Sequence, residues 1–238
     1  MTTNSQPLTP VAQSLWQVSA PTQRFDGGLR LPLSASLVRL ADSSLLLYSP
    51  APLSAAQVAA IAELGEVTHL VAPNLLHHLF VKQTTERYPQ ATLTGAPGLA
   101  RKRSDLQLSR ELSSATQPFG AELEVLVVAG APALNEVVLF HHPTGTLLCA
   151  DLLFHVANPE GLWSRLLLSA VGANGKLAQS RVWQVAVKDR PAYRASLERL
   201  LRWDVQRVLP THGAPAALER EQLARLLARA AGGPLPLG

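Results

Sequence analysis

Short apolar runs separated by polar and turn residues recur along the chain and predict alternating strands and helices. The opening part is expected to be β structure, because residues 15–18 alternate between apolar and polar and a turn signal follows at Asp26, Gly27 and Gly28. Residues 36–40 and 45–48 then flank a short polar turn. This arrangement predicts a β-hairpin.

A helix and a buried strand are expected next. Ser54 stands three residues before Gln57, which is the capping-box pattern of a helix start, and Gly65 ends the segment. Residues 55–64 are therefore predicted to be helical. Residues 67–72 form an apolar, β-branched run bounded by proline and asparagine, which is typical of a buried strand. This part of the chain is thus predicted as strand, helix, strand.

The rest of the chain continues the alternation. Further strands are predicted at 91–94, 123–128, 136–140, 146–150 and 205–209, and further helices at 79–88, 162–171, 180–187, 192–203 and 217–231. No internal repeat, low-complexity linker or second apolar core interrupts this order. We therefore expect a single domain over residues 15–231, with an N-terminal tail at 1–14 and a C-terminal tail at 232–238.

Composition narrows the class of protein. The 238 residues are 47% hydrophobic and 16% charged, which is ample for a packed core. The net charge of +4 is spread along the chain apart from Arg101, Lys102 and Arg103, so a nucleic-acid partner is not expected. One cysteine, no signal-peptide pattern and no apolar run of about 18 residues favour a cytoplasmic protein that does not enter a membrane.

Side chains able to bind a metal follow three of the predicted strands. His77 and His78 come shortly after the strand at 67–72, Asp151 directly follows the strand at 146–150, and His212 follows the strand at 205–209. Ligands of α/β sheets bind at the carboxyl ends of strands, so these groups are candidates for one site. Imidazole and carboxylate together suit zinc, iron or manganese.

Each of these residues also has an ordinary explanation, which the sequence leaves open. A histidine at a strand end is commonly a plain loop residue, and Asp151 has the position of a cap for a turn at 152–154. For His141 and His142 we favour the structural explanation, because they lie at the opposite end of the strand from Asp151. Cys149 alternates with core positions and is expected to be inert packing.

Several motifs in the same order resemble a known superfamily. The strand, helix and strand with a histidine loop, followed by Ala150-Asp151-Leu152-Leu153-Phe154 and Leu209-Pro210-Thr211-His212-Gly213, resemble the metallo-β-lactamase-like hydrolases. The similarity is closer still to a divergent, poorly characterised family within them, and it runs from about Leu15 to Ala231 through the motifs Val38-Arg39-Leu40, Tyr48-Ser49-Pro50, Ala72-Pro73-Asn74, Tyr88-Pro89-Gln90-Ala91, Ala96-Pro97-Gly98-Leu99, Asn135-Glu136-Val137 and Trp203-Asp204. The resemblance implies an α/β fold, a four-layer αβ/βα sandwich of two mixed β-sheets with flanking helices.

The resemblance also shows which usual metal ligands are missing. The superfamily's first motif is His-x-His-x-Asp-His, and placing its last His on His78 puts Pro73 and Leu75 at the first two His positions. His77 then stands where the motif has Asp. The next His of the superfamily would fall near residues 130–132, where the chain has none. The resemblance therefore implies that the first of the two usual metal sites is lost.

The ligands of the second metal site have counterparts. His77, His78, Asp151 and His212 match its positions, which implies one mononuclear His3Asp site for a divalent ion. We expect zinc foremost, with iron or manganese as alternatives, or no ion if the site is degenerate. The implied function is metal-dependent hydrolysis of a small ester, thioester, lactone or phosphoester. The alternative is a catalytically degenerate sandwich that binds a small ligand or a partner.

Two further residues are candidates for positioning the site. Asn74 immediately precedes the histidine loop, and Glu136 begins a strand near the vacated His position. Either could orient a ligand residue through a hydrogen bond, although we favour a structural role for each. The segments 95–117 and 157–175 are expected to set specificity, but they carry no motif that names a substrate. The sequence also leaves the oligomeric state open.

Overall fold

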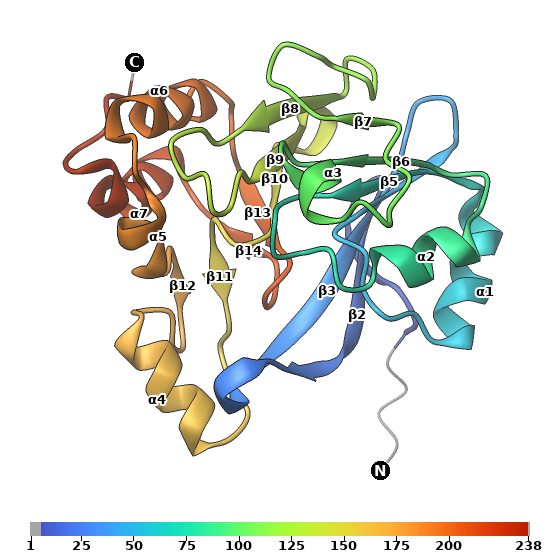
Figure 1. Ribbon diagram of the computed structural model, residues 1–238, viewed down its shortest axis with the longest axis horizontal. Coiled ribbons are helices and arrows are strands. Elements are labelled where there is room, and N and C mark those ends of the chain that lie inside the picture. The colour runs from blue at the N-terminus through green and yellow to red at the C-terminus, as the bar shows by residue number, and fades with distance from the viewer. Residues whose placement is uncertain (1–5, 238) are drawn as a thin grey trace.

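Alternating apolar side chains build a first sheet of seven strands, which lie side by side in their order along the chain (Figure 1). The computed structural model describes residues 6–237. Neighbouring strands from β1 to β4 are antiparallel, and those from β4 to β7 are parallel. The strands are β1 Thr9–Ala12, β2 Leu15–Arg24, β3 Arg30–Arg39, β4 Leu45–Tyr48, β5 Val67–Ala72, β6 Thr92–Gly95 and β7 Arg110–Glu111.

A second sheet of five strands packs against the first. Its order is β14-β13-β10-β9-β8, with β10 and β13 parallel and the other neighbours antiparallel. The strands are β8 Leu123–Val127, β9 Val137–His141, β10 Thr146–Cys149, β13 Arg207–Pro210 and β14 Ala216–Ala217. A separate pair, β11 Phe154–His155 and β12 Leu177–Ala178, extends from the end of this sheet.

Helices cover the outer face of each sheet (Figure 1). Beside the first sheet lie α1 Ala55–Leu64, α2 Val81–Arg87 and α3 Leu99–Lys102, and beside the second lie α5 Val182–Ala186, α6 Arg190–Leu200 and α7 Arg220–Ala231. The remaining helix, α4 Leu162–Ala170, stands apart from both layers, next to the tip of the β2–β3 hairpin. Short 3₁₀ turns occur at Asp26–Gly28 and His142–Thr144.

Strand β4 shows why the sandwich has four layers. All four of its residues are buried, which is typical of a strand covered on both faces. Leu45 and Leu47 belong to an apolar cluster with Ile61 of α1, whereas Leu46 and Tyr48 belong to the cluster between the two sheets. A third cluster joins the second sheet to α5, α6 and α7. The expected four-layer αβ/βα fold is therefore confirmed.

Local signals located α1 and β5 well. Both run over the predicted residues, and the Ser54 Oγ accepts the Gln57 N–H at 3.3 Å while the Gln57 Oε1 accepts the Ser54 N–H at 2.9 Å. The segment assigned to an N-terminal tail contains β1, although its first five residues lie outside the described part of the chain.

Other element limits differ from the sequence prediction because of pairing between distant segments. Strand β2 continues to Arg24 and strand β3 already begins at Arg30. The two strands pair with each other almost up to the turn between them. Helix α7 starts at Arg220 instead of residue 217, because Ala216 and Ala217 pair with β13. The long β2–β3 hairpin matters for the site, because its tip reaches α4.

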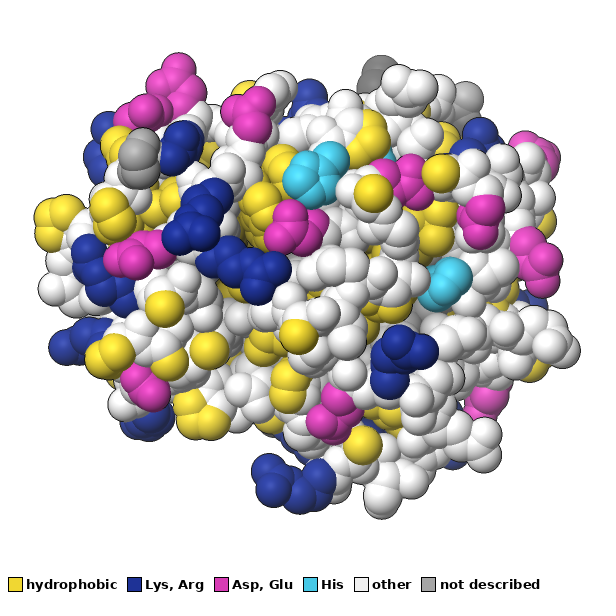
Figure 2. Space-filling model, turned by 90° about the horizontal axis from the view of Figure 1, so that it is seen from above, with side chains coloured by type: hydrophobic (Ala, Val, Ile, Leu, Met, Phe, Trp, Pro, Cys, Tyr) yellow, Lys and Arg dark blue, Asp and Glu magenta, His cyan; other side chains and the backbone are white. Residues whose placement is uncertain are grey.

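The surface gives two results that bear on partners. No helix within residues 6–237 is both long enough and apolar enough to cross a membrane. On the face viewed from above, basic and acidic side chains alternate with uncharged ones, and the apolar side chains are dispersed between them (Figure 2). This face has the mixed character of an ordinary solvated surface.

Gly213 lies where two backbone segments meet, and this position provides a test of the fold. Its φ is +114°, and a Cβ added there would stand 1.9 Å from the His155 carbonyl oxygen. We expect Gly213→Ala to lower the free energy of unfolding by at least about 3 kcal/mol, because the β11 backbone would have to move. Denaturant unfolding followed by circular dichroism measures the change.

Gly161→Ala is the matched control for this substitution. Gly161 also has a positive φ, +79°, but a Cβ there would meet no atom of residues 6–237 within 4 Å. This variant should therefore lose only the cost of left-handed backbone, about 1 kcal/mol. Equal losses in the two variants would show that the close approach at Gly213 is not what makes glycine necessary.

Candidate metal centre

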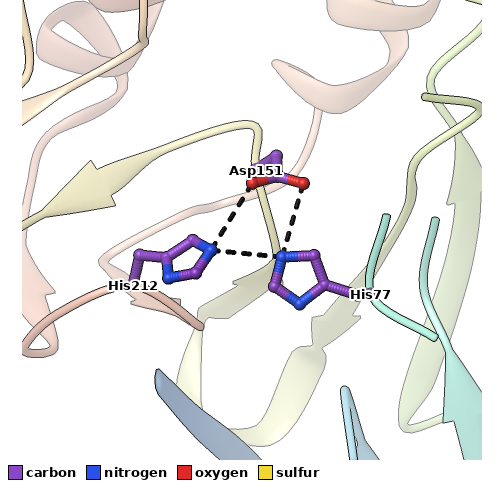
Figure 3. A group of neighbouring side chains, drawn as sticks. All are labelled: His77, Asp151 and His212. Carbon is purple, nitrogen blue, oxygen red and sulfur yellow. Dashed lines mark hydrogen bonds and ion pairs between the residues drawn. The ribbon is translucent and has the colours of Figure 1, made fainter. Parts of the chain in front are cut away.

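Three side chains from three strand ends converge at one edge of the sandwich (Figure 3). His77 comes from the loop after β5, Asp151 follows β10, and His212 follows β13. The two histidine Nε2 atoms are 3.2 Å apart. The Asp151 Oδ2 is 3.4 Å from the His77 Nε2, and the Asp151 Oδ1 is 3.6 Å from the His212 Nε2. Each ring thus directs the same nitrogen at the same point.

These separations fit a single small ion. A tetrahedral ion with bonds of about 2.0–2.1 Å keeps its donor atoms about 3.3 Å apart. The three side chains are nearly buried, with 9%, 13% and 4% of His77, Asp151 and His212 exposed. They also form a group of potential ligands whose donor atoms all lie within 4.8 Å of one another. Three protein ligands leave one tetrahedral position open, as in catalytic zinc sites.

His212 is held in one orientation from both ends. Its Nδ1 lies 2.9 Å from the Pro32 carbonyl oxygen, which can only accept a hydrogen bond, so the Nδ1 carries the proton. In the neutral ring the Nε2 is then free to donate its lone pair to an ion. The Phe154 ring stacks on the imidazole at 5.1 Å with an interplanar angle of 6°. The hydrogen bond to Pro32 therefore fixes the tautomer of this ring, and the stacking of Phe154 fixes its tilt.

His77 is oriented by its own loop. Its Nδ1 lies 2.9 Å from the Ser49 Oγ at the end of β4, which leaves the Nε2 facing Asp151. The buried Asn74 shapes the loop, because its Oδ1 accepts the backbone N–H groups of Leu76 and His77, both at 2.8 Å. This Asx-type turn is what aims the His77 side chain inward.

Asp151 is connected to the same asparagine. The Asn74 Nδ2 donates to the Asp151 Oδ2 at 2.7 Å, so one amide contacts both the loop of His77 and the carboxylate beside it. Burial acts to raise the pKa of Asp151, but the charge of His77 and hydrogen bonds with His212 and His77 outweigh it and hold that pKa far below its usual range. The carboxylate is therefore ionised, as a metal ligand must be.

Glu136 fixes the turn that carries Asp151. The Glu136 Oε1 accepts the N–H groups of Ala150 and Leu152 at 2.9 and 3.0 Å, and its Oε2 accepts the Asp151 N–H at 2.9 Å. Burial and the charge of Asp151 raise the pKa of Glu136 to about 8, although these three N–H groups favour its charged form. Glu136 is completely buried and has a positioning role at the turn, without being part of the ligand group.

His78 lies outside the group of three. Its Nδ1 accepts a hydrogen bond from the Arg103 Nη1 at 2.9 Å, and the same nitrogen of Arg103 also donates to the His78 carbonyl oxygen. Partial burial and the nearby charges of Lys102 and Arg103 lower the pKa of His78. The structure thus brings together His77, Asp151 and His212 of the four predicted ligands and places the fourth against a cation.

Sequence reasoning missed two groups that orient the histidines. Ser49 follows β4, a parallel neighbour of β5, so the strand-end argument used for His77 could have found it. Ser49 is also buried with a φ of +56°, an uncommon conformation outside glycine. Pro32 contributes only a backbone carbonyl, for which the residue type gives no signal.

The other histidines of interest have local partners. The His141 Nδ1 lies 2.8 Å from the Thr144 Oγ1, and the His142 Nε2 lies 3.2 Å from the Glu124 Oε2. Both are at the end of the second sheet opposite Asp151, because His141 pairs with Thr146 at the start of β10. Their contacts are structural.

Comparisons with known proteins place this geometry in context. A metallo-β-lactamase from Pontibacter korlensis is similar over 94% of this chain and 97% of its own, with 14% identity and a TM-score of 0.63. The mono-zinc form of the metallo-β-lactamase FIM-1 from Pseudomonas aeruginosa is similar over 94% of both chains, with 14% identity and a TM-score of 0.63. The metal-soaked Flv1 flavodiiron core from Synechocystis sp. PCC6803 is also similar, over 94% of this chain and 60% of its own, with 12% identity and a TM-score of 0.65. At these identities the likeness establishes the metallo-β-lactamase fold.

Sequence comparison gives a family without an assigned activity. No curated protein matched the sequence significantly. Residues 23–167, more than half of the chain and including His77 and Asp151, match the family model described as "Domain of unknown function (DUF4336)". The chain therefore belongs to the DUF4336 family and is a divergent protein of the metallo-β-lactamase fold.

Proposed function

We propose that His77, Asp151 and His212 hold one divalent metal ion and that the chain hydrolyses a small ester, thioester, lactone or phosphoester there. The observation that supports this proposal is the convergence of two Nε2 atoms and one carboxylate at separations of 3.2 to 3.6 Å. The proposed ligand set is His2Asp, which differs from the His3Asp set expected from the resemblance by the omission of His78. Zinc is the ion we expect, since two imidazoles and one carboxylate match its preferences.

An ion bound by these residues would lower the pKa of a water molecule toward neutrality and polarise the oxygen under attack. The protein's own contribution is preorganisation. Pro32 and Ser49 fix the two rings, and Asn74 fixes the carboxylate, so no side chain has to reorient when substrate arrives. Phe154 stacks on His212, and apolar side chains line the space beside the ligand residues.

The adjacent histidines allow a sharp test of the ligand set. Protein purified without affinity tag or chelator is loaded with zinc, dialysed and analysed by inductively coupled plasma mass spectrometry. We expect about one ion per chain in the parent and in His78→Ala. In His77→Ala and His212→Ala the affinity should fall by more than about 100-fold, because a direct ligand is lost.

Two other results of the metal analysis would contradict the proposal. An equal loss in His78→Ala would restore the four-ligand set and contradict the arrangement proposed here. An ion-free parent would refute the metal site and favour the alternative role, a degenerate sandwich that binds a ligand.

Hydrolysis of general ester and phosphodiester substrates by the loaded parent, abolished in Asp151→Asn, would support catalysis at the site.

Asn74 is predicted to act through Asp151 and His77. We expect Asn74→Ala to weaken zinc binding by about 10- to 100-fold, which is the usual effect of removing a residue that orients metal ligands. Competition with a chromophoric chelator measures the affinity, and circular dichroism confirms that the variant folds. Asn174→Ala is the control, since the Asn174 amide bonds only to Ser169 among the described residues. Unchanged affinity in Asn74→Ala would show that Asp151 is oriented without this amide.

A further inference from the structure

The three candidate ligands lie in the wall of a large apolar cavity. Its volume is about 710 Å³, which is in the range of small-molecule binding sites. Among the residues that the structure describes, the lining side chains other than the ligand residues, His78 and Ser180 are apolar. They include Phe25, Leu29, Leu31, Trp163, Leu167 and Leu168. A cavity of this composition favours a ligand whose own surface is largely apolar.

Charge argues against a phosphorylated ligand in this cavity. Within residues 6–237 no lysine or arginine lines the cavity, so a phosphate inside would find no cationic side chain among them. The nearby Arg103 is engaged elsewhere, because its guanidinium bonds to His78 and to the Asp105 carboxylate at 2.7 Å. A neutral reacting group fits the cavity better.

The outer wall of the cavity is already assembled without a ligand. The Trp163 Nε1 on α4 donates to the Gly27 carbonyl oxygen at 2.7 Å, and the buried Ser164 Oγ accepts the Arg30 N–H at 3.0 Å. These bonds fasten α4 to the tip of the β2–β3 hairpin. Between them lies a small apolar cluster of Leu31, Phe154, Val156, Leu168 and Ala173. The cavity therefore needs no large rearrangement to admit a ligand.

The apolar lining continues to the surface. In the described part of the chain, the residues that line the cavity and are more than half exposed are Leu76 at 51%, Leu79 at 60%, Trp163 at 53% and Val182 at 53%. Exposed apolar side chains gathered at the mouth of a cavity typically mark a binding site.

We propose that the cavity holds the hydrocarbon chain of an uncharged acyl ester, thioester or lactone, with the scissile carbonyl next to His77, Asp151 and His212. This assignment rests on the proposed function and narrows its substrate class by excluding phosphoesters. In the reaction, the oxygen of water bonds to the carbonyl carbon and the carbon–oxygen or carbon–sulfur bond breaks. The departing alcohol or thiol takes one hydrogen of the water, and the acyl group leaves as a carboxylic acid.

Binding of a chain that cannot be hydrolysed tests the cavity separately from catalysis. The ion-free protein is titrated by calorimetry with N-octylacetamide, below its critical micelle concentration, and with N-methylacetamide. We expect the octyl amide to bind and the methyl amide not to bind, because each fully buried methylene increases affinity about fourfold. Failure of the octyl amide to bind would overturn the proposal.

Neighbouring leucines of α4 provide matched variants. Leu167 lines the cavity, whereas Leu166 is 60% exposed and lies outside the lining. Leu167→Glu should weaken binding of the octyl amide at least tenfold, because it places a charge in the apolar wall, and Leu166→Glu should change it less than twofold. Equal weakening in both variants would place the chain on the outer surface and refute the cavity. If Leu167→Glu does not fold, Leu167→Trp tests the same wall by filling it.

Activity of the zinc-loaded protein then separates the two proposals. We expect kcat/KM to be at least tenfold higher for p-nitrophenyl octanoate than for the acetate, with bis(p-nitrophenyl) phosphate cleaved more slowly than either ester. Chain binding without any hydrolysis would refute the proposed function and leave the acyl cavity standing. Hydrolysis with equal rates on acetate and octanoate, or faster on the phosphodiester, would support the hydrolase and overturn the acyl assignment.

Discussion

The site depends on one buried carboxyl group, that of Glu136. Three successive backbone N–H groups, from Ala150 to Leu152, donate to its two oxygens and bend the chain at the end of β10. Burying a carboxyl group is costly unless its oxygens are hydrogen-bonded, and this turn supplies three donors. The turn is stabilised as well, because its buried backbone N–H groups obtain acceptors that they would otherwise lack. The position of Asp151 follows from that turn.

Asn74 extends this constraint to the other sheet. Asn74 lies just after the end of β5, and its side chain contacts Asp151, which lies just after the end of β10. Backbone bonds run alongside, since the Val137 N–H donates to the Pro73 carbonyl oxygen at 2.7 Å and the Leu75 N–H donates to the Leu134 carbonyl oxygen at 2.9 Å. The two sheets are thus joined at the edge where the candidate ligands meet. A ligand group shared between two sheets needs such a junction to keep its distances.

The sequence predicted those parts of the molecule that depend on local chemistry. The cap formed by Ser54 and Gln57 determined α1, and the strand-end positions of Asp151 and His212 were enough to predict that their side chains lie close together. The choice between His77 and His78 was beyond sequence reasoning. It depends on the hydrogen bonds of Asn74 and on Arg103, a residue distant in sequence. The cavity wall was equally hidden, because α4 meets the β2–β3 hairpin through contacts such as Trp163 to Gly27 that no periodic pattern encodes.

The approach of the two imidazoles has a thermodynamic consequence. Two unprotonated Nε2 atoms 3.2 Å apart repel each other, so without an ion one of them must carry a hydrogen and donate it to the other or to Asp151. The Nδ1 proton of His212 cannot serve, because Pro32 holds it on the far side of the ring. A cation entering the site would compete directly with that hydrogen. In a neutral His77 ring that hydrogen would have to move to the Nδ1, so occupancy by metal is linked to the tautomer of His77 and to the direction of its hydrogen bond with Ser49.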